Sequence, residues 1–276
     1  MTRWMLGSFL LAACGPPPHP EASEPTAPAA TAAPAPAPPA APSGEAPLSH
    51  EGLPPPRVAA TMGLTEATAG PVIMSTDALA EGESVALAPS PDHEHLVLVL
   101  TGELELAPGD APGALVRAWH VARARGVPVV LRAVKPSRLV TAFVDGEPIT
   151  KRDVEVINLV EREPLTWAGG KAHAWLGFED GRASFGLLLS HPDVGVPRHA
   201  HEDSTEVVGL LSGEGIMGIG DESREVASGD VLVMPKGVEH DYTPAGTETL
   251  FAVQLYLPPG PEQRFKDLAK KEADGP

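Results

Sequence analysis

Two segments carry most of the information in this chain: Gly195-Val-Pro-Arg-His199-Ala-His201-Glu-Asp-Ser-Thr-Glu206 and Gly229-Asp-Val-Leu-Val-Met-Pro235-Lys-Gly237-Val-Glu-His240. Together they supply three imidazoles and one carboxylate, a set of donors suited to a divalent transition metal. His199 and His201 are two residues apart, so on a strand both side chains point to the same face. The polar run before Glu206 lets the chain bend, and the Pro-Lys-Gly turn returns it so that His240 can face the other three. We therefore predict a metal site formed by His199, His201, Glu206 and His240.

The spacing of these residues resembles the paired signature of the cupin superfamily, H-x-H-x4-E-x6-G followed by G-x5-P-x-G-x2-H. Every position of the two patterns is filled, from His199 to Gly213 and from Gly229 to His240. The family often has Asn four residues after the last His, where this chain has Pro244, but that Asn is not a ligand. The resemblance implies a jelly-roll barrel that binds one divalent metal, with Fe, Mn, Ni, Cu and Zn all open. Such a ligand set leaves positions free on an octahedral ion, as a catalytic or ligand-binding site requires.

The rest of the globular region predicts an all-β fold. Its apolar runs are short, rich in Val and Leu, and interrupted by Gly, Pro and Asp, a pattern typical of sandwiches and barrels. Helices are expected at two places only, over residues 114–125 and over residues 261–272. The second of these overlaps a charged tail at residues 263–276.

An internal repeat divides the β region into two parts. A shift of 111 residues places His95–Glu103 on Glu206–Glu214, Gly109 on Gly220 and Gly126 on Gly237. One constant offset at three separate places indicates a duplication. We therefore expect two tandem cupin barrels, at residues 59–148 and residues 149–262, which is the arrangement of a bicupin.

The same offset predicts that the first barrel is degenerate. It maps His199, His201 and His240 onto Ala88, Ser90 and Val129, while Glu206 maps onto His95. His93 and His95 form a second H-x-H pair, but no Glu follows them at the required distance. We expect this barrel to serve packing or to line a shared interface.

Residues 1–13 resemble a bacterial lipoprotein signal, since a short apolar stretch after a basic start ends at Cys14. In such signals the Cys becomes the lipidated first residue; an ordinary secretory signal is the alternative. Cys14 is the only cysteine, so no disulfide can form within the chain. Residues 14–58 then form a disordered Pro/Ala-rich tether, which could reach on the order of 100 Å. We expect a lipid-anchored protein of the bacterial cell envelope, either periplasmic or at the outer membrane.

Charge and composition bear on partners. The net charge is −17, and no basic patch is longer than Lys270-Lys271, so nucleic-acid binding and attraction to an anionic membrane surface are disfavoured. A small-molecule ligand or substrate is the expected partner. A duplicated barrel resembles a dimer folded into one chain, which suits a monomer, while exposed sheet edges leave a homodimer open.

The resemblance allows an enzyme of the dioxygenase, decarboxylase, isomerase or lyase type. The alternatives are a non-catalytic module that binds or senses a small ligand or metal, and a protein in which the metal only stabilises the fold. Candidates for the substrate pocket are Tyr242, Gln254, Tyr256 and His173. Arg198, Glu239 and Asp241 are further candidates for an acid, a base or a binding group.

Overall fold

The computed structural model describes residues 67–69, 72–87, 92–109, 111–146 and 151–275. The predicted signal, Cys14 and the tether lie outside these described residues, so the expectations about anchoring stay predictions. In the described part of the chain, no helix has the length and apolar character needed to cross a membrane.

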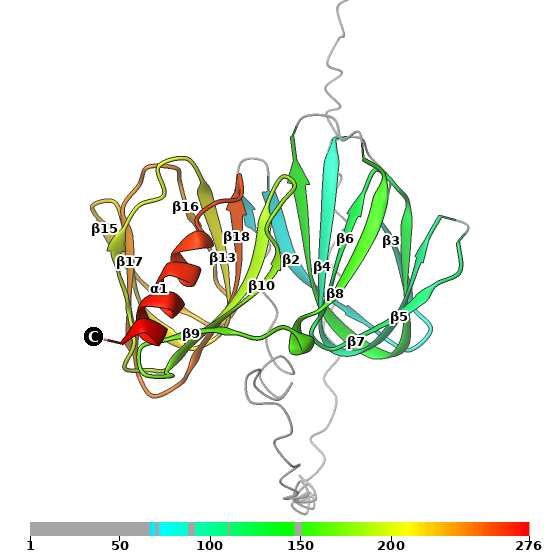
Figure 1. Cartoon of the computed structure of the whole chain (residues 1–276). Coiled ribbons are helices and arrows are strands. Elements are labelled where there is room, and N and C mark those ends of the chain that lie inside the picture. The colour runs from blue at the N-terminus through cyan, green and yellow to red at the C-terminus, as the bar shows by residue number, and fades with distance from the viewer. Residues whose placement is uncertain (1–66, 70–71, 88–91, 110, 147–150, 276) are drawn as a thin grey trace, which may run out of the picture. The chain divides into compact units, whose positions relative to one another are not determined.

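The first barrel is a sheet of eight antiparallel strands in the order β1-β2-β7-β4-β6-β8, with β3 paired to β7 and β5 paired to β4 (Figure 1). Two long strands, β4 and β7, form its centre, and each takes part in more than one pairing. The strands are β1 (Ala67–Ala69), β2 (Val72–Leu79), β3 (Ser84–Leu87), β4 (His93–Pro108), β5 (Ala114–Arg117), β6 (His120–Arg125), β7 (Val129–Asp145) and β8 (Asp153–Asn158).

The second barrel is made of two antiparallel sheets. One has six strands in the order β16-β13-β18-β11-β10-β9, and the other has four in the order β12-β17-β14-β15. A 3-10 turn, η2 (Leu159–Glu161), leads into it, and the helix α1 (Gln263–Asp274) follows it. The strands are β9 (Leu165–Trp167), β10 (Ala172–Phe178), β11 (Ser184–Ser190), β12 (Val196–His199), β13 (Thr205–Ser212), β14 (Glu214–Ile219), β15 (Glu222–Ala227), β16 (Val231–Met234), β17 (His240–Ala245) and β18 (Leu250–Leu257).

The all-β prediction is confirmed, and the repeat recurs in the backbone. Three pairs of glycines 111 residues apart share positive φ angles: Gly102 and Gly213 at 88°, Gly109 and Gly220 at 54° and 59°, and Gly126 and Gly237 at 61° and 72°. At Gly102 a side chain is also excluded by space, because an added Cβ would lie 2.4 Å from the carbonyl oxygen of Pro136. The two barrels therefore turn in the same way at the same points.

The apolar run of β4 is continuous because both of its faces are buried. Leu96, Leu98 and Leu100 belong to a core cluster that also contains Trp175 and Phe251 of the second barrel. The alternate residues Val97 and Val99 belong to the interior of the first barrel. A strand buried on both sides reads as an unbroken apolar run rather than as an alternation. The two barrels thus share one hydrophobic core cluster.

Two expectations differ from the structure. The helix predicted over residues 114–125 is wrong: the segment forms β5 and β6, with Trp119 between them at a φ of 68°. Both strands pair with β4, so tertiary pairing overrides a helix-compatible composition. The boundary between the barrels also lies later than residue 148, because β8 pairs with β6 of the first sheet. The helix expected at residues 261–272 is present as α1.

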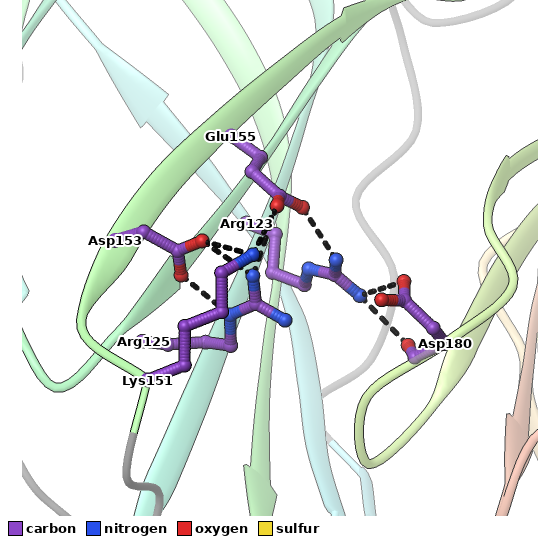
Figure 2. A network of polar contacts seen from close by, with 6 residues as sticks. All are labelled: Arg123, Arg125, Lys151, Asp153, Glu155 and Asp180. Carbon is purple, nitrogen blue, oxygen red and sulfur yellow. Dashed lines mark hydrogen bonds and ion pairs between the residues drawn. The ribbon is translucent and has the colours of Figure 1, made fainter.

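A buried arginine ties the first barrel to a turn of the second. Arg123 of β6 is 1% exposed, and it pairs with Glu155 of β8 and with Asp180 in the turn between β10 and β11, the latter at 2.8 Å (Figure 2). Arg125 continues the network, with Nε and Nη2 each 2.6 Å from an oxygen of Asp153. This polar network complements the apolar cluster that the two barrels share.

Candidate metal centre

The four predicted ligands converge in the second barrel. His199, His201, Glu206 and His240 each offer one ligand atom, and these atoms all lie within 4.8 Å of one another. Oε2 of Glu206 is 3.1 Å from Nε2 of His201 and 3.0 Å from Nε2 of His240. The rings of His199 and His240 are 4.2 Å apart between centroids. Among the residues that the structure describes, this is the one such cluster of three or more metal-binding side chains.

Strand pairing explains how residues far apart in sequence meet here. His199 ends β12 and is the direct cross-strand partner of His240, the first residue of β17. Glu206 lies in β13 of the other sheet, opposite Tyr256 of β18. The site therefore spans the two sheets of the barrel, with two imidazoles on one sheet and the carboxylate on the other.

His201 reaches the site in a different way from the one expected. The strand ends at His199, so the two histidines do not share a strand face. The backbone N–H of Gly237 instead donates to the carbonyl oxygen of His201 at 2.9 Å. The predicted Pro-Lys-Gly turn is present, closed by a bond from the N–H of Val238 to the carbonyl of Pro235. This turn therefore positions both His201 and His240.

Hydrogen bonds to the backbone orient two of the imidazoles for metal binding. Nδ1 of His199 lies 2.8 Å from the carbonyl oxygen of Pro197, and Nδ1 of His240 lies 3.0 Å from that of Val238. A carbonyl only accepts, so each Nδ1 carries the proton and each Nε2 presents a lone pair. Nε2 of His240 is buried and makes no hydrogen bond of sound geometry to any described residue. A buried lone pair left open beside a carboxylate fits a bound cation.

The protonation states of His199 and Glu206 also suit a cation. Burial lowers the pKa of His199 to about 4, with a further contribution from the nearby charge of Arg264, so this imidazole is neutral at neutral pH. Burial would raise the pKa of Glu206, but the close contacts of its carboxylate with His201 and His240 outweigh it and lower that pKa to about 2. For His240, burial lowers the pKa, yet the Glu206 carboxylate leaves it raised. A neutral imidazole and an ionised carboxylate are the forms that bind a metal.

A cavity of about 80 Å³ opens beside the four ligands. Space of this size holds on the order of six water molecules, or a small molecule of a few non-hydrogen atoms. Its wall is mostly apolar, with Leu188, Leu210, Met217 and Met234 among the lining residues. The centre is therefore open on one side to a small guest.

Three of the four predicted pocket residues line this cavity: Tyr242, Gln254 and Tyr256. The hydroxyl of Tyr242 donates to the carbonyl oxygen of Glu214 at 2.8 Å, so the ring rather than the hydroxyl faces the cavity. Gly215 makes room for that ring, because an added Cβ would lie 2.5 Å from it. His173 is not among the lining residues, and its Nδ1 is 3.0 Å from Oγ1 of Thr166.

Gln254 supports the carboxylate ligand directly. Its Nε2 donates to Oε1 of Glu206 at 3.0 Å, and both residues are buried. An ionised carboxylate only accepts, so the amide must turn its NH₂ toward Glu206. Its Oε1 is then left buried without a hydrogen-bond partner among the described residues.

The charged residues that flank the ligands in sequence form a separate cluster. Arg198 Nε is 3.0 Å from Glu239, and its Nη1 is 3.1 Å from Asp241. Arg198 and Glu239 are exposed and do not line the cavity, whereas Asp241 does. Arg198 is therefore an ion-pair partner for the two carboxylates, and not a group that faces the cavity.

Helix α1 supplies lining residues that the sequence interpretation missed. Arg264, Phe265 and Leu268 all line the cavity. Phe265 stacks on Trp167 of β9, with centroids 5.5 Å apart and planes 28° apart. The i, i+3 spacing of Phe265 and Leu268 was the available signal, since it gives the charged segment one apolar face. The tail is thus part of the cavity wall.

The first barrel has no counterpart of this site among its described residues. Its interior is filled by an apolar cluster that includes Leu104, Val129 and Leu131. His95, at the position of Glu206, is opposite Phe143 as Glu206 is opposite Tyr256. The rings of His95 and Phe143 pack edge to face, with centroids 4.5 Å apart. Positions 88 and 90 lie outside the described residues.

Comparison with known proteins supports the fold assignment. Residues 187–256 match the family described as Cupin domain. No curated protein matches the chain. A variant of oxalate decarboxylase from Bacillus subtilis is similar in structure, with a TM-score of 0.58 and 13% identity over 68% of this chain and 69% of that one.

Two further structures are similar at comparable levels. One is an oxalate decarboxylase from Bacillus subtilis studied for its Mn(II) centres, with a TM-score of 0.58, 12% identity, and coverage of 68% of this chain and 69% of that one. The other is a protein from Pseudomonas aeruginosa described as glyoxylate-induced, with a TM-score of 0.57, 16% identity, and coverage of 69% and 75%. At these identities the likeness concerns the fold, which is that of the cupin barrels predicted from the sequence.

Proposed function

We propose that this chain, which belongs to the cupin superfamily, is an enzyme that uses one divalent metal to transform a small molecule. The reaction types that the fold and ligands allow are those of a dioxygenase, decarboxylase, isomerase or lyase. Each needs a metal that keeps positions open for a substrate. The first barrel supports the second through their shared core and is not part of the reaction site.

One observation carries this proposal: the four ligands lie beside a cavity instead of inside a closed shell. Glu206 and His240 are buried, whereas His199 and His201 are partly exposed, so the cluster has a buried side and an open side. The open side faces a cavity with room for a small guest. A purely structural metal would be enclosed by its ligands.

When bound, the metal would supply Lewis acidity to a substrate oxygen. The chain's own residues then hold and orient the substrate. Tyr256 lies opposite Glu206, and burial together with that carboxylate raises its pKa well above the ordinary value. Its hydroxyl therefore stays protonated and does not act as a base. The apolar wall excludes bulk water from around the substrate.

Manganese is the first metal to test. The four side chains accept several divalent ions, and supply often decides which one is bound. One structure with the same fold is described by its Mn(II) centres. A Mn(II) signal in the electron paramagnetic resonance spectrum also reports on the ligand set, which Zn(II) cannot do.

A non-catalytic binding module is the second candidate, and one observation favours it. Among the described lining residues, no carboxylate outside the ligand set is free to act as a base, because Asp241 is paired with Arg198. An enzyme of this kind would have to move protons through the substrate or solvent. A sensor would need no such group.

We also propose that the protein is lipid-anchored to the bacterial cell envelope through Cys14, on the sequence pattern of residues 1–14. In cells that process lipoproteins, the wild type should fractionate with membranes and incorporate labelled fatty acid. The Cys14→Ser variant should do neither. Equal membrane association of the two would contradict the anchor.

The metal proposal is tested on protein purified without a metal-affinity tag. Elemental analysis should find one equivalent of a divalent transition metal in the wild type and almost none in a His199→Ala, His240→Ala double variant. Turnover of small organic acids, with or without consumption of oxygen, supports the enzyme. Binding without turnover supports the sensor. Full metal occupancy of the double variant would overturn the site itself.

A further inference from the structure

The guanidinium of Arg264 is a charged group at the cavity that has no assigned task. It lies near the start of α1, is half-buried and lines the cavity. No residue in the described ranges forms a hydrogen bond or ion pair with it. Burial lowers the pKa of Arg264, although the nearby Tyr256 and Glu206 partly raise it again. A partly desolvated cation without a counter-ion is unfavourable unless another group neutralises it.

Arg264 lines the same cavity as His199, His201, Glu206 and His240, so its charge lies beside the metal centre. The other cation nearby on the helix, Lys266, is paired with Glu179 and does not line the cavity. Of these two cations of α1, Arg264 is therefore the one that lines the cavity and has no ion-pair partner among the described residues.

We propose that Arg264 binds the carboxylate of a small organic acid, which fills the cavity between this guanidinium and the metal ligands. This inference rests on the proposed function, because it names the substrate class of the same site. With a divalent ion bound beside Glu206, the ion and Arg264 together leave an excess of two positive charges, which favours an anion. The guanidinium presents a planar fork of donors that matches a carboxylate.

A carboxylate suits the cavity better than a phosphate. Phosphate carries more charge and more acceptor oxygens, each of which needs a donor once it leaves water. Outside the ligand set, the described polar groups of the wall are few; Arg264 carries donors without a partner among the described residues, and Gln254 has an unpaired acceptor oxygen. The remaining wall is mostly apolar, which accommodates the carbon part of an acid. The unpaired oxygen of Gln254 further favours a guest with a hydroxyl.

Helix α1 is held over the cavity at several points, so Arg264 is positioned and not merely nearby. Phe265 stacks on Trp167. Glu262, at the N-cap, accepts from the hydroxyl of Ser184 at 2.9 Å in a buried setting. Near the other end, Glu272 accepts from the N–H of Gly169 at 2.8 Å. These contacts fix the helix, and a fixed cation loses little entropy when it binds an anion.

The test compares glycolate with its uncharged analogue glycolamide by calorimetry on the purified full-length protein, with and without Mn(II). We expect the wild type to prefer glycolate, and Arg264→Gln to weaken glycolate binding by about tenfold or more without changing glycolamide binding. Arg264→Lys should keep part of the preference, because it keeps the charge. Lys266→Gln is the matched control, which removes a cation from the same helix and should leave both affinities unchanged.

Three results would overturn the proposal: equal affinity of the wild type for the two probes, unchanged glycolate binding by Arg264→Gln, or tighter binding of inorganic phosphate than of glycolate. Absence of glycolate binding at about 10 mM would also count against it. The metal-free arm separates this inference from the proposed function. If Mn(II) does not bind but the metal-free protein still selects glycolate through Arg264, the metal proposal fails and this one stands.

Discussion

Replacing Gln254 by Leu should weaken metal binding without touching a metal ligand. The amide of Gln254 donates to Oε1 of Glu206 at 3.0 Å, and the exchange removes this donor while it roughly keeps the side-chain volume. Glu206 is 3% exposed, so water cannot readily replace the lost bond. The carboxylate would then be less stable in its charged form, which is the form that binds a cation.

The size of the effect follows from the kind of bond. A buried hydrogen bond to a charged group contributes about 1.5–3 kcal/mol, which corresponds to a loss of metal affinity of about 10- to 100-fold. The stability of the metal-free protein should change less. The substitution leaves one Glu206 oxygen unpaired, but it also removes the buried Oε1 of Gln254, which has no partner among the described residues. The first change lowers the free energy of unfolding and the second raises it, so they partly cancel.

The assay is competition for Mn(II) against a chromophoric chelator, together with urea denaturation of the metal-free forms. Tyr242→Phe is the control, since it alters another cavity residue whose hydroxyl bonds to the backbone of Glu214 and not to a ligand. It should leave the metal affinity unchanged. A Gln254→Leu protein that binds Mn(II) as tightly as the wild type would refute the role given to this amide.

Three further outcomes are expected. In metal-free protein the folded pKa of Glu206, about 2, is below the ordinary value of 4.5. The ionised Glu206 therefore contributes its full stabilisation of the fold above pH 4.5, and this contribution is lost as the pH falls toward 2. In urea titrations over that range, the free energy of unfolding of the wild type should fall by about 3 kcal/mol more than that of Glu206→Gln. Arg123→Met should destabilise the protein by about 3 kcal/mol, because Glu94 stays buried without the Arg123 charge, which is the largest of those that lower its pKa. Asp180→Asn, at a site 72% exposed, should cost less than about 1 kcal/mol in thermal unfolding. Trp167→Ala should speed amide hydrogen exchange in α1 by removing the stack on Phe265, and unchanged exchange would show that the helix does not depend on it.

Much of the site was predictable because the ligands lie within two short sequence motifs of fixed spacing. The Pro-Lys-Gly turn returns His240 to the cluster as expected, and its glycine has the positive φ that such turns favour. The spacing did not predict that β12 ends at His199. That end depends on how far β12 pairs with β17, and pairing between strands some forty residues apart is not visible in the local sequence.

The misassigned elements have the same origin. Residues 114–125 contain Ala, Val and Arg in an order that suits a helix as well as two short strands, and only the pairing with β4 decides between them. The segment at β8 is readable as a strand, but nothing local tells which sheet it joins. Likewise, α1 was visible as a helix, whereas its role in the cavity depends on Trp167, about a hundred residues earlier. Tertiary partners, not propensity, set all three.

The differences between the two barrels explain why, among the described residues, only the second has a cluster of metal ligands. In the first barrel, Leu104 and Val129 stand at the positions of Gly215 and His240, and both are buried in an apolar interior. In the second barrel those positions hold the glycine that seats the Tyr242 ring and a ligand beside an ionised, buried carboxylate. A cavity and a buried charge both reduce the stability of a fold. The packed barrel offsets that loss through the core cluster in which Leu96 and Leu98 meet Trp175 and Phe251. The first barrel therefore adds packing to the core that the barrel with the open centre shares.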